Sequence, residues 1–192
     1  LFSGNITKAN WYYDDDSPLG LTEIARIFRD NLKPGEAKKW IDEALGLWLE
    51  QKRIEGLDKI ENEIERFSKE EKEDLNYLCY IKASIYIWRK EKKDKDEALR
   101  CISLAITLLP KYISALNLKT DILYSLGRFD EGLEYIKKAE RLARDEPELW
   151  GELMRILEMK AELQRKLRDL NEAIKTCEEV LEIEPDNKDS LN

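Results

Sequence analysis

The chain of 192 residues contains no histidine. Histidine is the base that activates the nucleophile in Ser-His and Cys-His enzymes, so catalytic pairs of this kind are excluded. The sequence also has no glycine-rich loop of the kind that cradles phosphate groups. The acidic run Asp14-Asp15-Asp16 lacks the spaced oxygen ligands of a calcium loop. We therefore expect no catalytic residues, no cofactor and no metal, and a protein that is not an enzyme.

Cysteine is rare as well. Cys79, Cys101 and Cys177 are widely spaced and form no CxxC pair. An odd, dispersed set in an acidic chain is typical of free thiols in a reducing compartment. Because the sequence also shows no signal-peptide pattern, we expect a cytoplasmic protein.

Long apolar runs are missing too, and no stretch approaches the roughly 20 residues that cross a bilayer, so we expect no membrane segment. Lysine and glutamate are abundant, and glutamine occurs only at Gln51 and Gln164, a usage that resembles thermophilic proteins. The formal net charge of −8 argues against a nucleic-acid partner, because binding to phosphates needs clustered Lys and Arg.

Proline and glycine are scarce, with 5 and 8 residues, which suits long helices with short connections. Four short strings share one shape, with a small residue third and an aliphatic residue fourth. They begin at Ile54, Asp96, Asp130 and Asn171, and their small residues recur at intervals of 42, 34 and 41 residues. A recurring interval near this length indicates stacked helical repeats.

Apolar spacing and cap residues predict a run of amphipathic helices. The first begins after Ser17, with Pro18 at its first position, and Ser68 with Glu71 forms a capping box at the start of another. No strand-type alternation of useful length occurs, so the predicted fold is all-α. The expected helices span about 18–31, 35–50, 54–67, 68–87, 96–109, 112–125, 129–143, 147–167 and 170–183.

The segment that runs from Leu116 through Leu123-Tyr124-x-x-Gly127-Arg128-Phe129 to Gly132-Leu133 resembles the tetratricopeptide repeat. The same template fits three other stretches: Trp40-x3-Ala44-x2-Leu47 with Gly56-x3-Ile60, Ala98-x3-Ile102-x2-Ala105-x4-Pro110, and Ala173-x3-Cys177-x2-Val180-x4-Pro185. The resemblance implies an α–α superhelix, a right-handed solenoid of about four helical hairpins plus an N-terminal helix. We expect a repeat domain at 35–192 after an irregular segment and helix at 1–34. Small residues are expected where the two helices of a hairpin cross: Ala44, Gly56, Ala98, Gly132 and Ala173.

In this family the first helix of each hairpin lines a concave face. The resemblance therefore implies a groove that binds a peptide or a helix of a partner protein, so the chain is expected to be an interaction scaffold. The candidate groove residues are Ile41, Leu45, Trp48, Ile81, Ile85, Trp88, Asn117, Asp121 and Tyr124, followed by Arg155, Glu158, Glu162, Arg165 and Lys166. The N-terminal half of this groove is apolar and the C-terminal half is charged.

Two other interpretations of the apolar half stay open. Residues 1–31 could fill the trough themselves, because they carry Phe2, Trp11, Tyr12 and Tyr13 and the stripe Leu21, Ile24 and Phe28. The apolar residues could also be plain core between hairpins. A further possibility is a structural module that self-associates into a homo-oligomer through its trough or its terminal helices.

Overall fold

The computed structural model describes residues 17–89 and 91–183. These residues form helices and turns without a strand, which confirms the all-α prediction. The chain divides into two compact units, Leu1–Pro110 (unit 1) and Lys111–Asn192 (unit 2). The described helices include no span long and apolar enough to cross a membrane.

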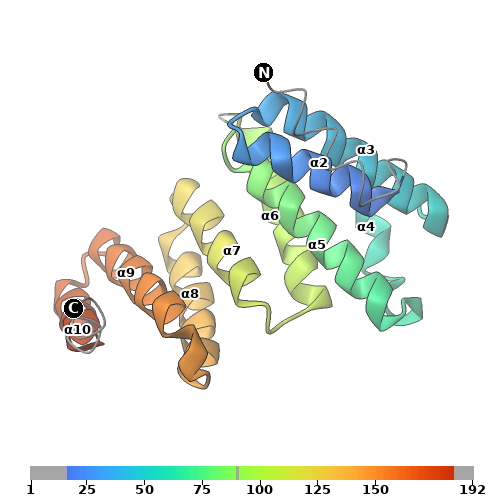
Figure 1. The fold of residues 1–192 in the computed structure, drawn as a ribbon. Helices are drawn as coiled ribbons and strands as arrows, with labels where there is room; N and C mark the ends of the chain where they lie inside the picture. Colours follow the sequence, from blue (N-terminus) through green and yellow to red (C-terminus); the bar gives the residue numbers. More distant parts are fainter. Residues whose placement is uncertain (1–16, 90, 184–192) are drawn as a thin grey trace, which may run out of the picture. The chain divides into compact units, whose positions relative to one another are not determined.

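Unit 1 is built from helices whose starts follow the cap residues of the sequence. The Ser17 hydroxyl accepts a hydrogen bond from the Gly20 N–H at 2.9 Å, and the Ser68 capping box is present as predicted. In Figure 1, α2 lies alongside α3, and α5 lies alongside α6. The elements of unit 1 are α2 (Pro18–Asp30), α3 (Pro34–Lys52), α4 (Leu57–Ile60), the 3₁₀ turn η1 (Ile64–Arg66), α5 (Lys69–Tyr86) and α6 (Lys92–Leu108).

The helix predicted over 54–67 is wrong. This segment contains only the four-residue α4 and the three-residue η1. Its apolar side chains act as separate anchors, because Ile54, Ile60 and Phe67 are buried, and the Phe67 ring meets the Trp48 ring edge-on at 5.4 Å between centroids. Gly56 precedes α4 and lies at no helix crossing, so its expected role at a hairpin contact is also wrong.

Since 54–67 forms no full helix, α3 packs instead against α2. The small residues Ala37 and Ala44 of α3 are fully buried, with Ile41 between them. The hairpins are therefore α2–α3, α5–α6, α7–α8 and α9–α10, and the N-terminal helix is the first helix of the first hairpin. The boundary expected between residues 34 and 35 falls in the first turn of α3, which packs against α2.

The first helices of the four hairpins share one pattern of buried positions. An apolar residue is followed three and four positions later by two further buried residues. The sets are Leu21, Ile24 and Ala25 in α2; Leu75, Leu78 and Cys79 in α5; Leu116, Lys119 and Thr120 in α7; and Leu153, Ile156 and Leu157 in α9. The common pattern places equivalent faces of these helices against the core.

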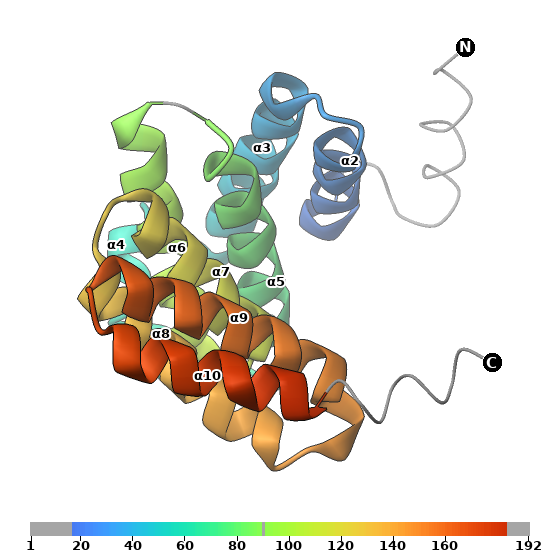
Figure 2. The same cartoon turned by 90° about the vertical axis from the view of Figure 1, so that its left-hand side faces the viewer.

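Unit 2 contains α7 (Ile113–Ser125), α8 (Phe129–Arg144), the 3₁₀ turn η2 (Pro147–Leu149), α9 (Trp150–Lys166) and α10 (Leu170–Ile183). Gly127 turns the chain between α7 and α8 with φ of 74°, a conformation that favours glycine. A Cβ at Gly132 would lie 3.2 Å from Leu163 Cδ2 and 3.8 Å from Leu123 Cβ. The small residue thus lies where α8 meets both α7 and α9, as predicted. Figure 2 shows α10 running alongside α9.

Candidate functional site

In unit 2, α7 and α9 are the first helices of their hairpins. Together they line a surface hollow of about 330 Å³. Asn117 and Asp121 come from α7, one turn apart, and Arg155, Glu158 and Glu162 come from α9. The lining is completed by Ile136 of α8 and Met159 of α9. The structure therefore brings together the candidate residues of the third and fourth hairpins.

Two hydrogen bonds join α7 and α9 around the hollow. Asn117 Nδ2 donates to Glu152 Oε1 at 2.5 Å, and the Tyr124 hydroxyl donates to Glu162 Oε1 at 2.8 Å. Asn117 Oδ1, however, is buried without a hydrogen-bond partner in the described part of the chain. A buried acceptor without a donor costs roughly 1–3 kcal/mol, so this atom favours a ligand that supplies an N–H group.

The carboxylates of the hollow differ in how well they are satisfied. Hydrogen bonds from Arg165 and from Tyr124 lower the pKa of Glu162 to about 2. Burial raises the pKa of the Asp121 carboxyl, and the charge of Arg155 opposes this shift. Asp121 is therefore a partly desolvated acid that a cation from outside would stabilise.

The sequence of unit 2 matches a known family. The family model described as tetratricopeptide repeat matches residues 113–146 and 155–187. These two segments are tetratricopeptide repeats. The first repeat contains α7 and α8, and the second contains most of α9 and all of α10. The resemblance inferred from the residues around Gly127 is confirmed there.

Comparison with solved structures extends the similarity of fold over most of the chain. A crystal structure of MamA is 16% identical, with a TM-score of 0.66, covering 98% of this chain and 91% of that one. The nearly identical tetratricopeptide-like repeats of a putative kinesin light chain from Podosopora anserina are 10% identical, with a TM-score of 0.61, covering 95% and 83%. No curated protein matches the sequence. At such low identity the structures support the repeat fold alone.

The apolar half of the predicted groove is closed. Ile41, Leu45, Trp48, Ile81 and Ile85 are all buried, so the expectation that they line an open trough is wrong. The physical reason is that α2 packs against both α3 and α5, while Phe67 covers Trp48. Of the α2 stripe that was considered as a cover for the trough, Leu21 and Ile24 are buried and Phe28 is half-buried. Phe2, Trp11, Tyr12 and Tyr13 lie outside the described residues.

Trp88 is the exposed member of the predicted apolar set. Its side chain is 77% exposed, and Leu32 beside the same hollow is 89% exposed. Leu32 adopts a φ of 56° in the turn after α2, a conformation that disfavours leucine. Arg29, Asp30 and Pro34 also line this hollow of about 450 Å³, and the buried Ile85 lies beneath it. Leu32 and Trp88 are called the Leu32–Trp88 patch below.

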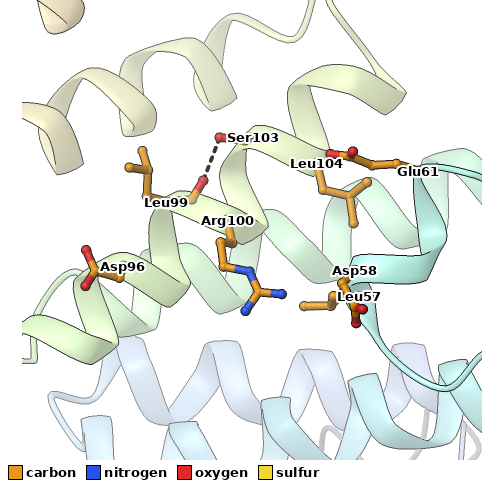
Figure 3. Close-up of a pocket in the computed structure, with 8 residues that line it drawn as sticks. All are labelled: Leu57, Asp58, Glu61, Asp96, Leu99, Arg100, Ser103 and Leu104. Atoms are coloured by element: carbon orange, nitrogen blue, oxygen red, sulfur yellow. Dashed lines mark hydrogen bonds between the residues drawn. The ribbon is translucent and has the colours of Figure 1, made fainter.

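A third hollow lies between α4 and α6 in unit 1 and has a volume of about 520 Å³. Figure 3 shows the Arg100 side chain reaching from α6 toward Leu57 and Asp58. The Ser103 hydroxyl donates to the Leu99 carbonyl at 2.7 Å and is therefore engaged within its own helix. No sequence pattern indicates this hollow, because it depends on where α4 packs. Within the described residues no group of three or more acidic or cysteine side chains could hold a metal ion.

Proposed function

We propose that this protein is a non-enzymatic scaffold that binds a protein segment, and that the face of α7 and α9 in unit 2 is its contact for a basic segment. The tetratricopeptide fold supports a role in protein–protein interaction. The chemistry of the hollow supports the finer statement. Its lining contains three carboxylates and one guanidinium group, so a partner with Lys or Arg side chains complements it.

The observation that carries this proposal is a buried acceptor and a partly buried acid, one helical turn apart on α7. Asn117 Oδ1 is a buried acceptor without a donor, and the Asp121 carboxyl is partly buried, with its pKa raised by that burial. An extended peptide offers a backbone N–H and a side chain at neighbouring positions. A basic peptide can therefore place its cation beside Asp121, and its N–H can reach Asn117 Oδ1 once the amide side chain turns toward the hollow.

Titration with a labelled peptide tests the proposal. We expect a peptide rich in Lys and Arg to bind, and a matched peptide with Glu in place of each basic residue not to bind. Asn117→Ala and Asp121→Asn should each weaken binding about tenfold, or about 1.4 kcal/mol. Glu134→Gln is the matched control, because it removes one negative charge from an exposed position of α8 outside the hollow. Equal binding of both peptides, or full binding by both variants, contradicts the proposal.

The pH dependence of binding follows from Asp121. Because burial raises the pKa of its carboxyl, this group protonates at a higher pH than an ordinary aspartate. Below that pKa the neutral acid no longer attracts a cation, so affinity for the basic peptide should fall as the pH is lowered through it. Asp121→Asn should remove this dependence.

The Leu32–Trp88 patch is proposed as a second, apolar contact for a protein partner. Exposed Trp is costly in water and frequent at the centre of protein interfaces. Leu32 has a positive φ in the turn between the two helices of its hairpin. In the equivalent turn between α7 and α8 the residue with a positive φ is Gly127, so Leu32 places an apolar side chain where glycine would fit. Both features favour a surface that becomes covered on binding.

A further inference from the structure

Helix α10 presents an apolar stripe to solvent. Leu170, Ile174 and Leu181 are 58%, 56% and 63% exposed, and Cys177 between them is also exposed. The four residues follow one another at intervals of 4, 3 and 4 positions. This is the spacing of the a and d positions in a helix that packs against another helix.

A groove adjoins this stripe. It has a volume of about 410 Å³ and lies between α9 and α10, with Ala161, Ala173, Cys177 and Val180 in its wall. Ala173 and Val180 occupy the positions that extend an a/d stripe into a wider apolar face. Glu158, Glu162 and Arg165 of α9 also line the groove. The stripe and the α10 wall of the groove therefore form one continuous apolar surface.

The same chain shows what covers such a groove elsewhere. In unit 1, α5 packs against both helices of the α2–α3 hairpin. In unit 2, α9 packs against α8 and is hydrogen-bonded to α7. In each case a helix lies against the preceding hairpin. Among the described residues, no further helix lies against the α9–α10 hairpin.

We propose that α10 of a second copy of this chain covers this surface, with the two helices antiparallel around a two-fold axis. An isologous contact requires a surface that complements itself. In the antiparallel arrangement Leu170 meets Leu181 of the second copy, and Ile174 meets Cys177 of the second copy. The apolar layers are then complete along the helix.

The polar residues beside the stripe select the antiparallel direction. Asn171 and Glu178 occupy equivalent flanking positions, one heptad apart. In an antiparallel pair Asn171 faces Glu178 of the second copy, and its amide can donate to that carboxylate. In a parallel pair Glu178 would face Ala173 or Val180, which leaves the carboxylate against apolar side chains. Antiparallel helices also place opposite ends of their dipoles together.

The oligomeric state tests the inference. We expect the mass by light scattering to rise from monomer to dimer between micromolar and millimolar concentration, because a helix of 14 residues forms a small interface. Ile174→Glu should keep the chain monomeric with unchanged helicity. Lys175→Ala, on the polar side of α10, is the matched control and should still dimerise. A wild-type chain that stays monomeric, or a dimer that tolerates Ile174→Glu, overturns the proposal.

Crosslinking tests the direction. Cys79 and Cys101 are buried, so Cys177 is the exposed thiol among the three cysteines. Ile174→Cys places a new thiol opposite Cys177 of the second copy, and mild oxidation should then give a covalent dimer on a non-reducing gel. Wild type, with Cys177 alone, should give none. A covalent dimer from wild type, or none from Ile174→Cys, overturns the antiparallel arrangement. Neither experiment uses the peptide, so its outcome is independent of the proposed function.

Discussion

Lys82 in α5 is a buried cation that joins α5 to α3. Its Nζ lies 2.9 Å from Asp42 Oδ1 and 3.5 Å from Glu97 Oε1. The Tyr86 hydroxyl donates to the same Asp42 carboxylate at 2.7 Å. A buried charge is tolerated only when it is paired and hydrogen-bonded. The carboxylate of Asp42 therefore holds together side chains from two helices.

The pH dependence of stability should report on this cluster. Burial raises the pKa of Asp42, but hydrogen bonds from Lys38, Tyr86 and Lys82 lower it by more, so the pKa in the folded state is lowered. A lowered pKa stabilises the fold above the unfolded-state value, and this contribution is lost as the pH falls through the folded-state value.

Lys82→Met should reduce the free energy of unfolding by about 1–3 kcal/mol at neutral pH and by less in acid. Urea denaturation at both pH values measures this difference. Lys39→Met removes an exposed lysine of α3 and should change stability by about 0.5 kcal/mol or less. Equal effects of the two substitutions would show that the buried cluster contributes nothing.

The connection between α3 and α5 decides which tryptophan belongs to the core. Trp48 is buried against Phe67 of this connection, whereas Trp88 is exposed after the end of α5. Trp48→Ala should lower the free energy of unfolding by about 3–5 kcal/mol. Trp88→Ala should change it by about 0.5 kcal/mol or less. Chemical denaturation of the two variants checks this, and similar losses would contradict the burial that separates them.

Helices could be predicted from the sequence where apolar spacing, a turn residue and a small contact residue occur together. The hairpins of unit 2 follow from apolar spacing together with Gly127 in the turn and Gly132 at the crossing. The face formed by Asn117, Asp121 and Tyr124 follows from the same register. Local sequence sufficed there because each helix has its own stop and its own small contact residue.

The error at 54–67 has a physical cause. Ile54, Ile60 and Phe67 are apolar because each is buried separately, and apolar spacing alone does not distinguish this from one helical stripe. A better signal was present in α3, where Ala37-x3-Ile41-x2-Ala44 repeats the Ala98-x3-Ile102-x2-Ala105 pattern. The Ala98 pattern lies on the second helix of its hairpin. The same pattern in α3 would therefore have identified α3 as the second helix of a hairpin with α2. The burial of Ile81 and Ile85 depends on packing that distant residues determine, which a local pattern does not contain.

At the scale of the whole molecule, the proposals concern three surfaces of different chemistry among the described residues. Unit 1 has the apolar Leu32–Trp88 patch, and unit 2 has the acidic hollow of α7 and α9 and the apolar stripe of α10. Each can be removed by substitutions that leave the others intact. The proposed partner binding and the proposed self-association can therefore be tested separately.

Nuclear magnetic resonance of the isotope-labelled chain during titration with the Lys- and Arg-rich peptide tests the central claim most directly. The side-chain amide of Asn117 and the backbone amides around Asp121 should shift with increasing peptide, while the exposed control position Glu134 should not. Shifts confined to unit 1, or no shift at Asn117 at saturating peptide, would contradict the assignment of the α7–α9 face as the binding surface.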